Sequence, residues 1–182
     1  LFQTGYLTIK GINPVTGAFI LKFPNNEVKY GFYNSLMNYF VDNNKKIKRL
    51  TTDELIDDLV AENIEDFFSR ITAFYSGIPY DLENKKEAHY QTIFYVLLAK
   101  YIKVEEHTAT GSADAIIELP DQVYIFEFKM SNNGTAKDAI QQIDTQGYAK
   151  KYNNPSETRK IYKVGVVFDV KERTIVEYLV NE

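Results

Sequence analysis

The first part of the chain begins with two short apolar runs and continues with apolar residues at the spacing of a helix. Residues 6–12 and 18–23 are β-prone runs, and residues 13–17 (NPVTG) between them have the composition of a turn. This order predicts a β-hairpin. From Glu27 to Phe40, apolar and aromatic residues recur three and four positions apart, which predicts a helix with a broad apolar face. Two further helices are predicted, each after a residue that can cap it: 51–61 (Thr51 or Thr52) and 64–75 (Asn63).

The second part of the chain predicts an α/β layout. Residues 84–101 have the most regular helical pattern, and Thr135 with Asp138 has the spacing of a capping box. The predicted elements are a helix at 84–101, strands at 104–107, 112–119 and 123–130, a helix at 136–151, and strands at 160–169 and 173–180. Such an order favours one mixed central sheet with helices on its faces. We therefore expect an N-terminal hairpin and helical connector at 1–80 and an α/β core at 81–182.

Composition excludes several kinds of site. The 182 residues contain no cysteine and only two histidines, His89 and His107, so thiolate chemistry and histidine-rich zinc sites are excluded. The net charge is −4, so any contact with nucleic acid needs a local basic patch. The apolar runs are too short to cross a bilayer and no signal peptide is visible, so we expect no membrane contact and a cytoplasmic location.

The candidate chemistry lies in residues 111–129 (GSADAIIELPDQVYIFEFK). A hairpin that turns on Pro120-Asp121 places Asp114 opposite Glu127, where the Cβ atoms of paired residues are about 5 Å apart. Lys129 follows Glu127 by two residues and therefore points to the same face. Backbone geometry alone thus predicts a cluster of two carboxylates and one ammonium among apolar neighbours.

Such a cluster fits a divalent cation. Two facing carboxylates repel each other, and buried charges need a partner or a metal. Oxygen ligands favour Mg²⁺ or Mn²⁺ over zinc. Lys129 could then act on the attacking water and stabilise negative charge on a phosphate. The competing interpretation is a structural salt-bridge cluster on a half-exposed sheet.

These residues resemble a known family. Asp114, twelve intervening residues and Glu127-Phe128-Lys129 resemble the core motif of the PD-(D/E)XK nuclease superfamily. Further segments resemble a bacterial family within it, whose members carry an N-terminal AAA-ATPase-like domain: residues 5–10 (GYLTIK), 78–80 (IPY), 90–91 (YQ), 124–129 (YIFEFK) and 147–149 (GYA). The resemblance implies a restriction-endonuclease-like core. It also implies that the chain, which begins with leucine, is the C-terminal part of a longer ATPase-containing protein.

The resemblance assigns roles to individual residues. Asp114 and Glu127 match the metal-binding acids and Lys129 matches the catalytic lysine, although Ala113 stands where the family has proline. Many family members have an acid on the first core helix, and Glu87 matches it best, followed by Glu83. Glu87 is also three residues after Asn84, which is the position of the glutamate in a capping box. The glutamine and tyrosine that some members have on the later helix match three candidates, at a spacing that departs from the common pattern: Gln142, Tyr148 and, as an alternative, Gln146.

The expected substrate is nucleic acid, with DNA favoured over RNA. Residues 137–163 have a local charge excess of +3, and Lys137, Lys150 and Lys151 are candidate phosphate contacts there. A plain surface helix explains these lysines as well. The leading hypothesis is a Mg²⁺- or Mn²⁺-dependent nuclease domain. The alternatives are a non-catalytic module with the same fold, which binds protein or nucleic acid, and hydrolysis of another phosphoester.

Overall fold

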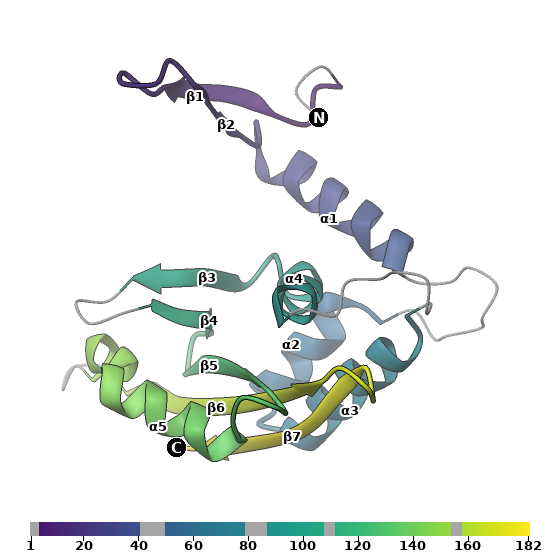
Figure 1. Cartoon of the computed structure of the whole chain (residues 1–182), viewed down its shortest axis with the longest axis vertical. Helices are drawn as coiled ribbons and strands as arrows, with labels where there is room; N and C mark the ends of the chain where they lie inside the picture. Colours follow the sequence, from purple (N-terminus) through teal and green to yellow (C-terminus); the bar gives the residue numbers. More distant parts are fainter. Residues whose placement is uncertain (1–3, 41–49, 79–86, 108–111, 154–157) are drawn as a thin grey trace. The chain divides into compact units, whose positions relative to one another are not determined.

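The computed structural model describes residues 4–40, 50–78, 87–107, 112–153 and 158–182, except for the side chains at 34, 36–40, 87–89 and 104–107 (Figure 1). The chain divides into two compact units, Leu1–Val41 and Asp42–Glu182. In the described part of the chain, no helix has both the length and the apolar character that a membrane span requires.

The first unit is a β-hairpin followed by a helix, as the sequence predicts. Strands β1 (Thr8–Ile12) and β2 (Phe19–Lys22) pair antiparallel. The Asn13 side chain shapes the turn, since its Oδ1 accepts hydrogen bonds from the backbone N–H groups of Val15 and Thr16 at 2.9 and 3.1 Å. Helix α1 (Asn26–Phe40) follows, and Asn25 caps it by accepting a hydrogen bond from the Val28 N–H at 2.8 Å.

The second unit is built on a five-stranded mixed sheet in the order β3-β4-β5-β6-β7. Its strands are β3 (Ile102–His107), β4 (Ser112–Glu118), β5 (Gln122–Met130), β6 (Lys160–Asp169) and β7 (Thr174–Asn181). Neighbours pair antiparallel except β5 and β6, which are parallel. A parallel pair needs a crossover connection, and the helix α5 (Ala136–Gln146) with the 3₁₀ turn η1 (Tyr148–Tyr152) supplies it. The predicted mixed α/β fold is confirmed.

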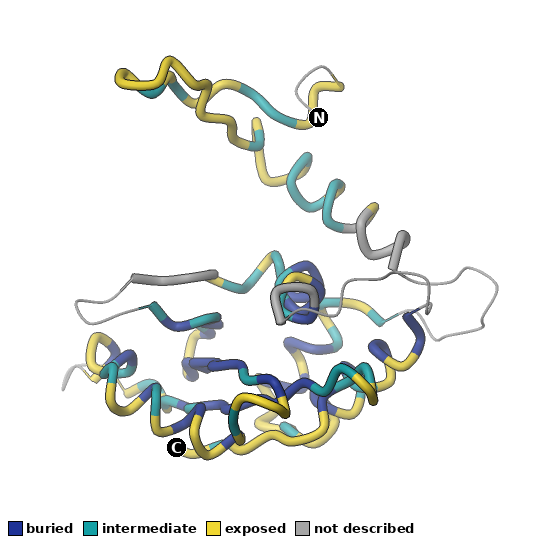
Figure 2. The backbone as a smooth tube through the Cα atoms, viewed as in Figure 1, coloured by how far each residue is buried: buried dark blue, intermediate teal, exposed yellow. Residues whose placement is uncertain are grey.

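Helices cover both faces of this sheet. Alternate β5 residues point to opposite faces, and both sets are buried (Figure 2). Val123 and Ile125 pack with Ile140 and Ile143 of α5 on one face. On the other face, the ring of Phe126 lies 5.2 Å from that of Phe94 in α4 (Glu87–Leu97) and 6.2 Å from that of Phe67 in α3 (Ile64–Ser76).

The helices α2 (Thr52–Val60) and α3 belong to the sheet unit, whereas the sequence assigns them to an N-terminal connector ending at residue 80. Tyr124 of β5 donates a hydrogen bond to the Leu59 carbonyl at 2.7 Å. Thr52 donates another to the Leu97 carbonyl of α4, also at 2.7 Å. The helical pattern reveals an apolar face but not which surface buries it, so the sequence could not assign these helices to the sheet.

The helix ends agree with the sequence at Thr51 and Thr135 and differ from it at Asn63 and Gly147. Thr51 and Thr135 form capping boxes with Glu54 and Asp138, as the spacing predicts. Asn63 makes no side-chain cap bond, because its amide donates to Asp66 Oδ2 at 2.6 Å instead. The long helix predicted at 136–151 is interrupted at Gly147, whose φ of 65° is left-handed and ends α5.

Candidate active site

The β4–β5 hairpin sets the geometry of the site. The turn is closed by a hydrogen bond from the Leu119 N–H to the Gln122 carbonyl at 2.8 Å. The register is the one expected from a turn at Pro120-Asp121, with these pairs: Glu118 with Val123, Ile117 with Tyr124, Ile116 with Ile125, and Ala115 with Phe126. At the next position the Asp114 carboxylate takes part in the pairing itself, since its Oδ2 accepts a hydrogen bond from the Phe128 N–H at 2.8 Å. Asp114 is thereby fixed beside the Glu127–Phe128 peptide.

Glu127 is the most unusual charged residue of the site. It is only 3% exposed. Its Oε1 lies 3.6 Å from the Nζ of Lys129, which shares its sheet face. Its Oε2 is also buried and has no hydrogen-bond partner among the described residues. A buried carboxylate oxygen without a partner is costly, so this atom is where a cation would fit.

Electrostatics agree with this geometry. Burial raises the pKa of Glu127 to about 8, the nearby charge of Asp114 adds to the rise, and Lys129 opposes it. Two carboxyl groups on neighbouring strands thus disfavour each other's ionised forms. A divalent cation bound to both would remove that repulsion, and its oxygen-ligand preference matches this donor set.

Lys129 is held from the other side by α5. Its Nζ donates a hydrogen bond to the Gln142 Oε1 at 2.5 Å. The half-buried Gln142 therefore lies in the cluster, although its sequence position fits an exposed helix residue equally well. Tyr148 joins the same group from η1. Burial raises the pKa of its hydroxyl, a hydrogen bond with Gln142 opposes the rise, and the charges of Glu127 and Asp114 add to it.

One contact was not predicted from the sequence. Tyr95 of α4 donates a hydrogen bond from its hydroxyl to the Asp114 carbonyl at 3.1 Å. The bond ties the start of β4 to the helix on the opposite face of the sheet. In the sequence, this contact is indicated only by the position of Tyr95 next to Phe94 in the apolar stripe. A tyrosine there buries an apolar ring and needs a hydrogen-bond partner for its hydroxyl.

Other predicted residues lie away from this cluster or have side chains outside the described set. The backbone of Glu87 begins α4, but its side chain is outside the described set, as are those of His89 and His107. Within the described ranges, no group of three or more His, Cys, Asp or Glu residues is placed to hold a metal. Two carboxylates are nevertheless enough for Mg²⁺, which commonly keeps several waters and binds one or two carboxylates plus substrate phosphate.

The predicted basic patch is divided by the fold. Lys137 lies in the first turn of α5, and Lys150 and Lys151 lie on η1, all exposed. These two positions are separated by the length of α5, about 16 Å. The three other cations of this segment make ion pairs: Lys160 with Glu62 at 2.6 Å, Lys163 with Asp144 at 2.8 Å and Arg159 with Glu118 at 3.5 Å.

The comparison with known families decides the superfamily. The profile of the PD-(D/E)XK nuclease superfamily matches residues 85–178, which hold the whole β4–β5 hairpin and α5. The chain belongs to the PD-(D/E)XK nuclease superfamily. Among curated proteins it is similar to the "Uncharacterized protein in vnfD 5'region" of Azotobacter chroococcum mcd 1, with 30% identity over 191 residues. That match covers 100% of this chain and 36% of the relative, so the chain spans about a third of the relative's length. No solved structure matches the chain.

Superfamily membership supports the interpretation of the β4–β5 hairpin as a PD-(D/E)XK motif, and it does not by itself assign an activity to the chain. The matched range runs from the start of α4 into β7 and leaves out α2 and α3. The PD-(D/E)XK resemblance drawn from Asp114, Glu127 and Lys129 is therefore confirmed at the level of the superfamily.

Proposed function

We propose that the chain is a metal-dependent nuclease domain that hydrolyses phosphodiester bonds of nucleic acid. The main observation behind this proposal is the buried Glu127, whose Oε2 has no hydrogen-bond partner among the described residues. Glu127 lies next to Lys129 of the same strand and Asp114 of the neighbouring strand. A purely structural salt bridge does not need a second carboxylate beside a buried one. The superfamily of the chain supports the same function.

Asp114 and Glu127 are the proposed ligands of Mg²⁺ or Mn²⁺. When bound, the cation would neutralise the carboxylates, polarise the phosphate and lower the pKa of nearby water. Glu87 is proposed as a further acid of the site, by resemblance to the superfamily. Two hydrogen bonds fix the position of Asp114. The Phe128 N–H donates to its carboxylate, and the Tyr95 hydroxyl donates to its backbone carbonyl.

Lys129 is the proposed catalytic lysine. In hydrolysis a water oxygen forms a bond to phosphorus and loses a proton, the bond from phosphorus to the leaving sugar oxygen breaks, and that sugar oxygen takes up a proton to leave as a hydroxyl. Negative charge builds up on the phosphate oxygens during this step, and a fixed cation stabilises it. Gln142 positions Lys129 for this purpose, because its Oε1 accepts the hydrogen bond from the Lys129 Nζ.

The wider setting is also a proposal. We infer a bacterial, cytoplasmic protein in which an ATPase-like domain precedes this nuclease domain, with DNA as the substrate rather than RNA. The similar Azotobacter protein supports a longer chain, since only 36% of its length is matched.

A cleavage assay tests the proposal. Wild type, Lys129→Ala and the control Lys100→Ala are incubated with DNA or RNA, each single- or double-stranded, in Mg²⁺ or Mn²⁺. Lys100 is an exposed lysine that pairs with Asp53 at 3.6 Å. We expect cleavage by wild type and control, and a loss of about 100-fold or more in Lys129→Ala. Equal activity of wild type and Lys129→Ala would overturn the assignment. No cleavage together with no cation binding would identify a non-catalytic module.

A further inference from the structure

Several cations gather around a single carboxylate at the end of β4. Lys103 of β3 donates a hydrogen bond to the Glu118 Oε1 at 2.7 Å, and the Tyr152 hydroxyl of η1 donates to the same oxygen at 2.8 Å. Arg159, the residue before β6, places its Nη1 3.5 Å from the other carboxylate oxygen. Lys151 of η1 acts on the same carboxylate through its charge. These five residues form the Glu118 cluster.

The Glu118 cluster carries more positive than negative charge. The Nζ of Lys151 lies 4.6 Å from the centroid of the Tyr152 ring, and the guanidinium carbon of Arg159 lies 5.7 Å from it, both within the range of cation–π contacts. Burial acts to raise the pKa of Glu118, but hydrogen bonds from Lys103 and Tyr152 and the charges of Lys103 and Lys151 lower it overall. Three cations thus surround one ionised acid, a net charge of +2.

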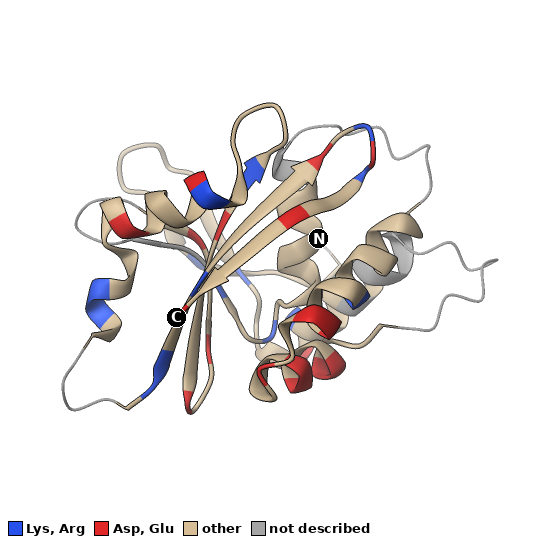
Figure 3. Ribbon diagram, turned by 90° about the horizontal axis from the view of Figure 1, so that it is seen from below, with Lys and Arg blue, Asp and Glu red and all other residues tan. Residues whose placement is uncertain are grey.

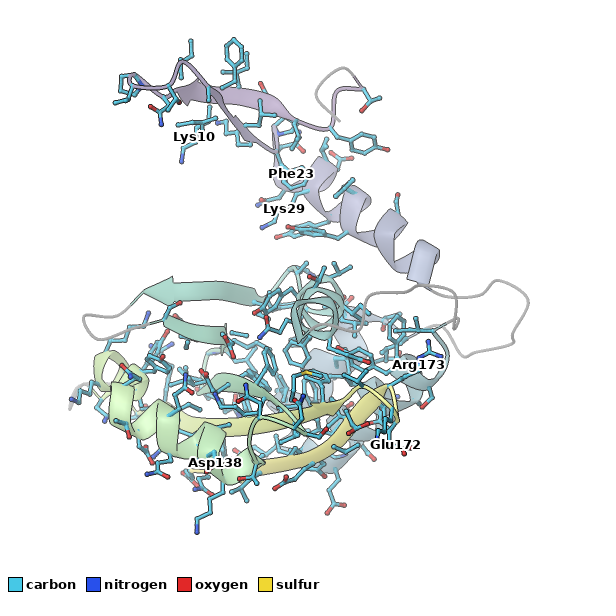
Figure 4. The ribbon with its side chains drawn as sticks, in the orientation of Figure 1. Lys10, Phe23, Lys29, Asp138, Glu172 and Arg173 are labelled. Atoms are coloured by element: carbon cyan, nitrogen blue, oxygen red, sulfur yellow. The ribbon has the colours of Figure 1, made fainter. Side chains whose placement is uncertain are left out.

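This excess is local to one end of the sheet unit. Among the described residues it persists when the neighbouring Lys150 of η1 and Asp121 of the β4–β5 turn are added, which gives four cations against two acids. Figure 3 shows the basic positions of η1 and of the start of β6 at the same end of the unit. The start of α5 differs, because Lys137 is followed there by Asp138, which Figure 4 labels. An ion pair that only fixed η1 would require one cation.

The Glu118 cluster lies on the sheet face that carries the proposed catalytic residues. Asp114 and Glu118 are four residues apart on β4, so they share a face and lie about 13 Å apart. Tyr148 and Tyr152, at the two ends of η1, pack in one core cluster with Ile116, the residue midway between Asp114 and Glu118. Phosphates of one duplex strand rise about 3.4 Å each along the axis, so this separation corresponds to about four nucleotides.

We propose that the Glu118 cluster binds a backbone phosphate of the nucleic-acid substrate, with Lys103, Lys151 and Arg159 as the contacts. The cluster would hold the strand about four nucleotides from the bond that is cleaved. Phosphate contacts of this kind fix the register of a protein on nucleic acid and carry no sequence information. An acidic protein segment would also suit three cations, but the face shared with Asp114 favours the substrate strand. The proposal rests on the proposed nuclease function, because it assigns both sites to one strand.

Fluorescence anisotropy of labelled duplex and single-stranded DNA, titrated with the 182-residue chain, measures the binding. It is run in EDTA, and also in Mg²⁺ with Lys129→Ala in every protein, so that cleavage does not interfere. The test variant is Lys103→Gln/Lys151→Gln. Circular dichroism shows whether each variant is folded. Lys151→Glu alone is a second variant, since it leaves the ion pair of Lys103 with Glu118 in place.

The matched control is Lys163→Gln/Lys171→Gln. Lys163 forms an ion pair with Asp144 at 2.8 Å, as Lys103 does in the Glu118 cluster at 2.7 Å. Lys171 is an exposed lysine of the β6–β7 turn. The control therefore removes the same two charges from one paired and one exposed lysine of the sheet unit.

We expect the test variant to bind DNA about tenfold or more weakly than the control, with a slope of log K against log salt reduced by about 1.8 for duplex, from two lost phosphate contacts. Lys151→Glu should lose affinity in the same direction. Lys103→Arg/Lys151→Arg should bind like wild type, because it keeps both charges. In steady-state cleavage the test variant should raise KM about tenfold and leave kcat within about twofold, since the cluster does not touch the reacting atoms.

Equal affinity and equal salt slope for the test and control variants would overturn the proposal, and so would no binding of either DNA by wild type in both formats. An equal loss in the arginine variant would also overturn it, because the lysines would then act through packing and not through charge. Cleavage with an unchanged KM in the test variant would count against the Glu118 cluster and leave the proposed function in place. Binding that depends on the cluster, in a wild-type chain that cleaves nothing, would support the phosphate contact and count against the proposed function.

Discussion

The buried carboxyl of Glu127 should make the stability of the metal-free chain depend on pH. Its pKa rises from an ordinary 4.5 to about 8 in the folded chain, first because of burial and then because of Asp114. Between these two values, the folded chain holds a proton that the unfolded chain has released. The free energy of unfolding should therefore fall as pH rises through this window.

Glu127→Gln removes this ionisation and nearly keeps the shape of the side chain. Each pKa unit corresponds to about 1.4 kcal/mol. The difference in unfolding free energy, variant minus wild type, should therefore grow by up to about 1.4 kcal/mol per pH unit between about pH 5 and pH 8. It should level off above pH 8, where Glu127 is ionised in both states of the wild type.

Urea unfolding followed by circular dichroism, in EDTA at pH 5, 6, 7 and 8, measures this difference. Glu177→Gln removes an exposed carboxyl from β7 and is the matched control. Saturating Mg²⁺ should restore stability to wild type at pH 8 and not to Glu127→Gln, because cation binding favours the ionised carboxylate. Parallel pH curves for wild type and Glu127→Gln would contradict the raised pKa of Glu127, since the carboxyl would then ionise alike in the folded and unfolded chain.

Two further predictions follow from contacts of α5. A Cβ at Gly165 of β6 would lie 2.2 Å from the Ala136 carbonyl oxygen, so Gly165→Ala should destabilise the chain by about 3 kcal/mol in urea unfolding. Gly31→Ala, where a Cβ has nothing within 4 Å, is the control, and similar midpoints for both would contradict the close approach. Gln142→Ala should lower kcat about tenfold and leave KM unchanged, because it removes the acceptor that positions Lys129. An unchanged kcat in steady-state cleavage would show that Gln142 does not position the lysine.

The sequence predicted best where the backbone alone decides the geometry. The Pro120-Asp121 turn fixes the β4–β5 register, and the two-residue period of a strand then places Glu127 and Lys129 on one face. The capping box at Thr135 was also predictable, because its residues are close in sequence. The family resemblance rested on the same hairpin, and the superfamily match supports it.

The sequence predicted less where the rotation or docking of a helix decides the result. The approach of Gln142 to Lys129 depends on which face α5 turns toward β5, and the hydrogen bond from Tyr95 to Asp114 depends on how α4 lies on the sheet. Helical periodicity gives an apolar face without its partner, so α2 and α3 were assigned to a connector. Gly147 offered a helix-end signal, but apolar residues beyond it continued the pattern, and only its left-handed backbone shows the break.

A crystal of the chain soaked in Mn²⁺, with anomalous difference density measured at the β4–β5 hairpin, tests the proposed metal site most directly. We expect a peak within coordination distance of both the Asp114 carboxylate and the Glu127 Oε2. The same soak of Glu127→Gln should weaken or abolish that peak. A wild-type map with no peak between Asp114 and Glu127, from crystals that show Mn²⁺ bound elsewhere on the chain, would contradict the proposed metal site.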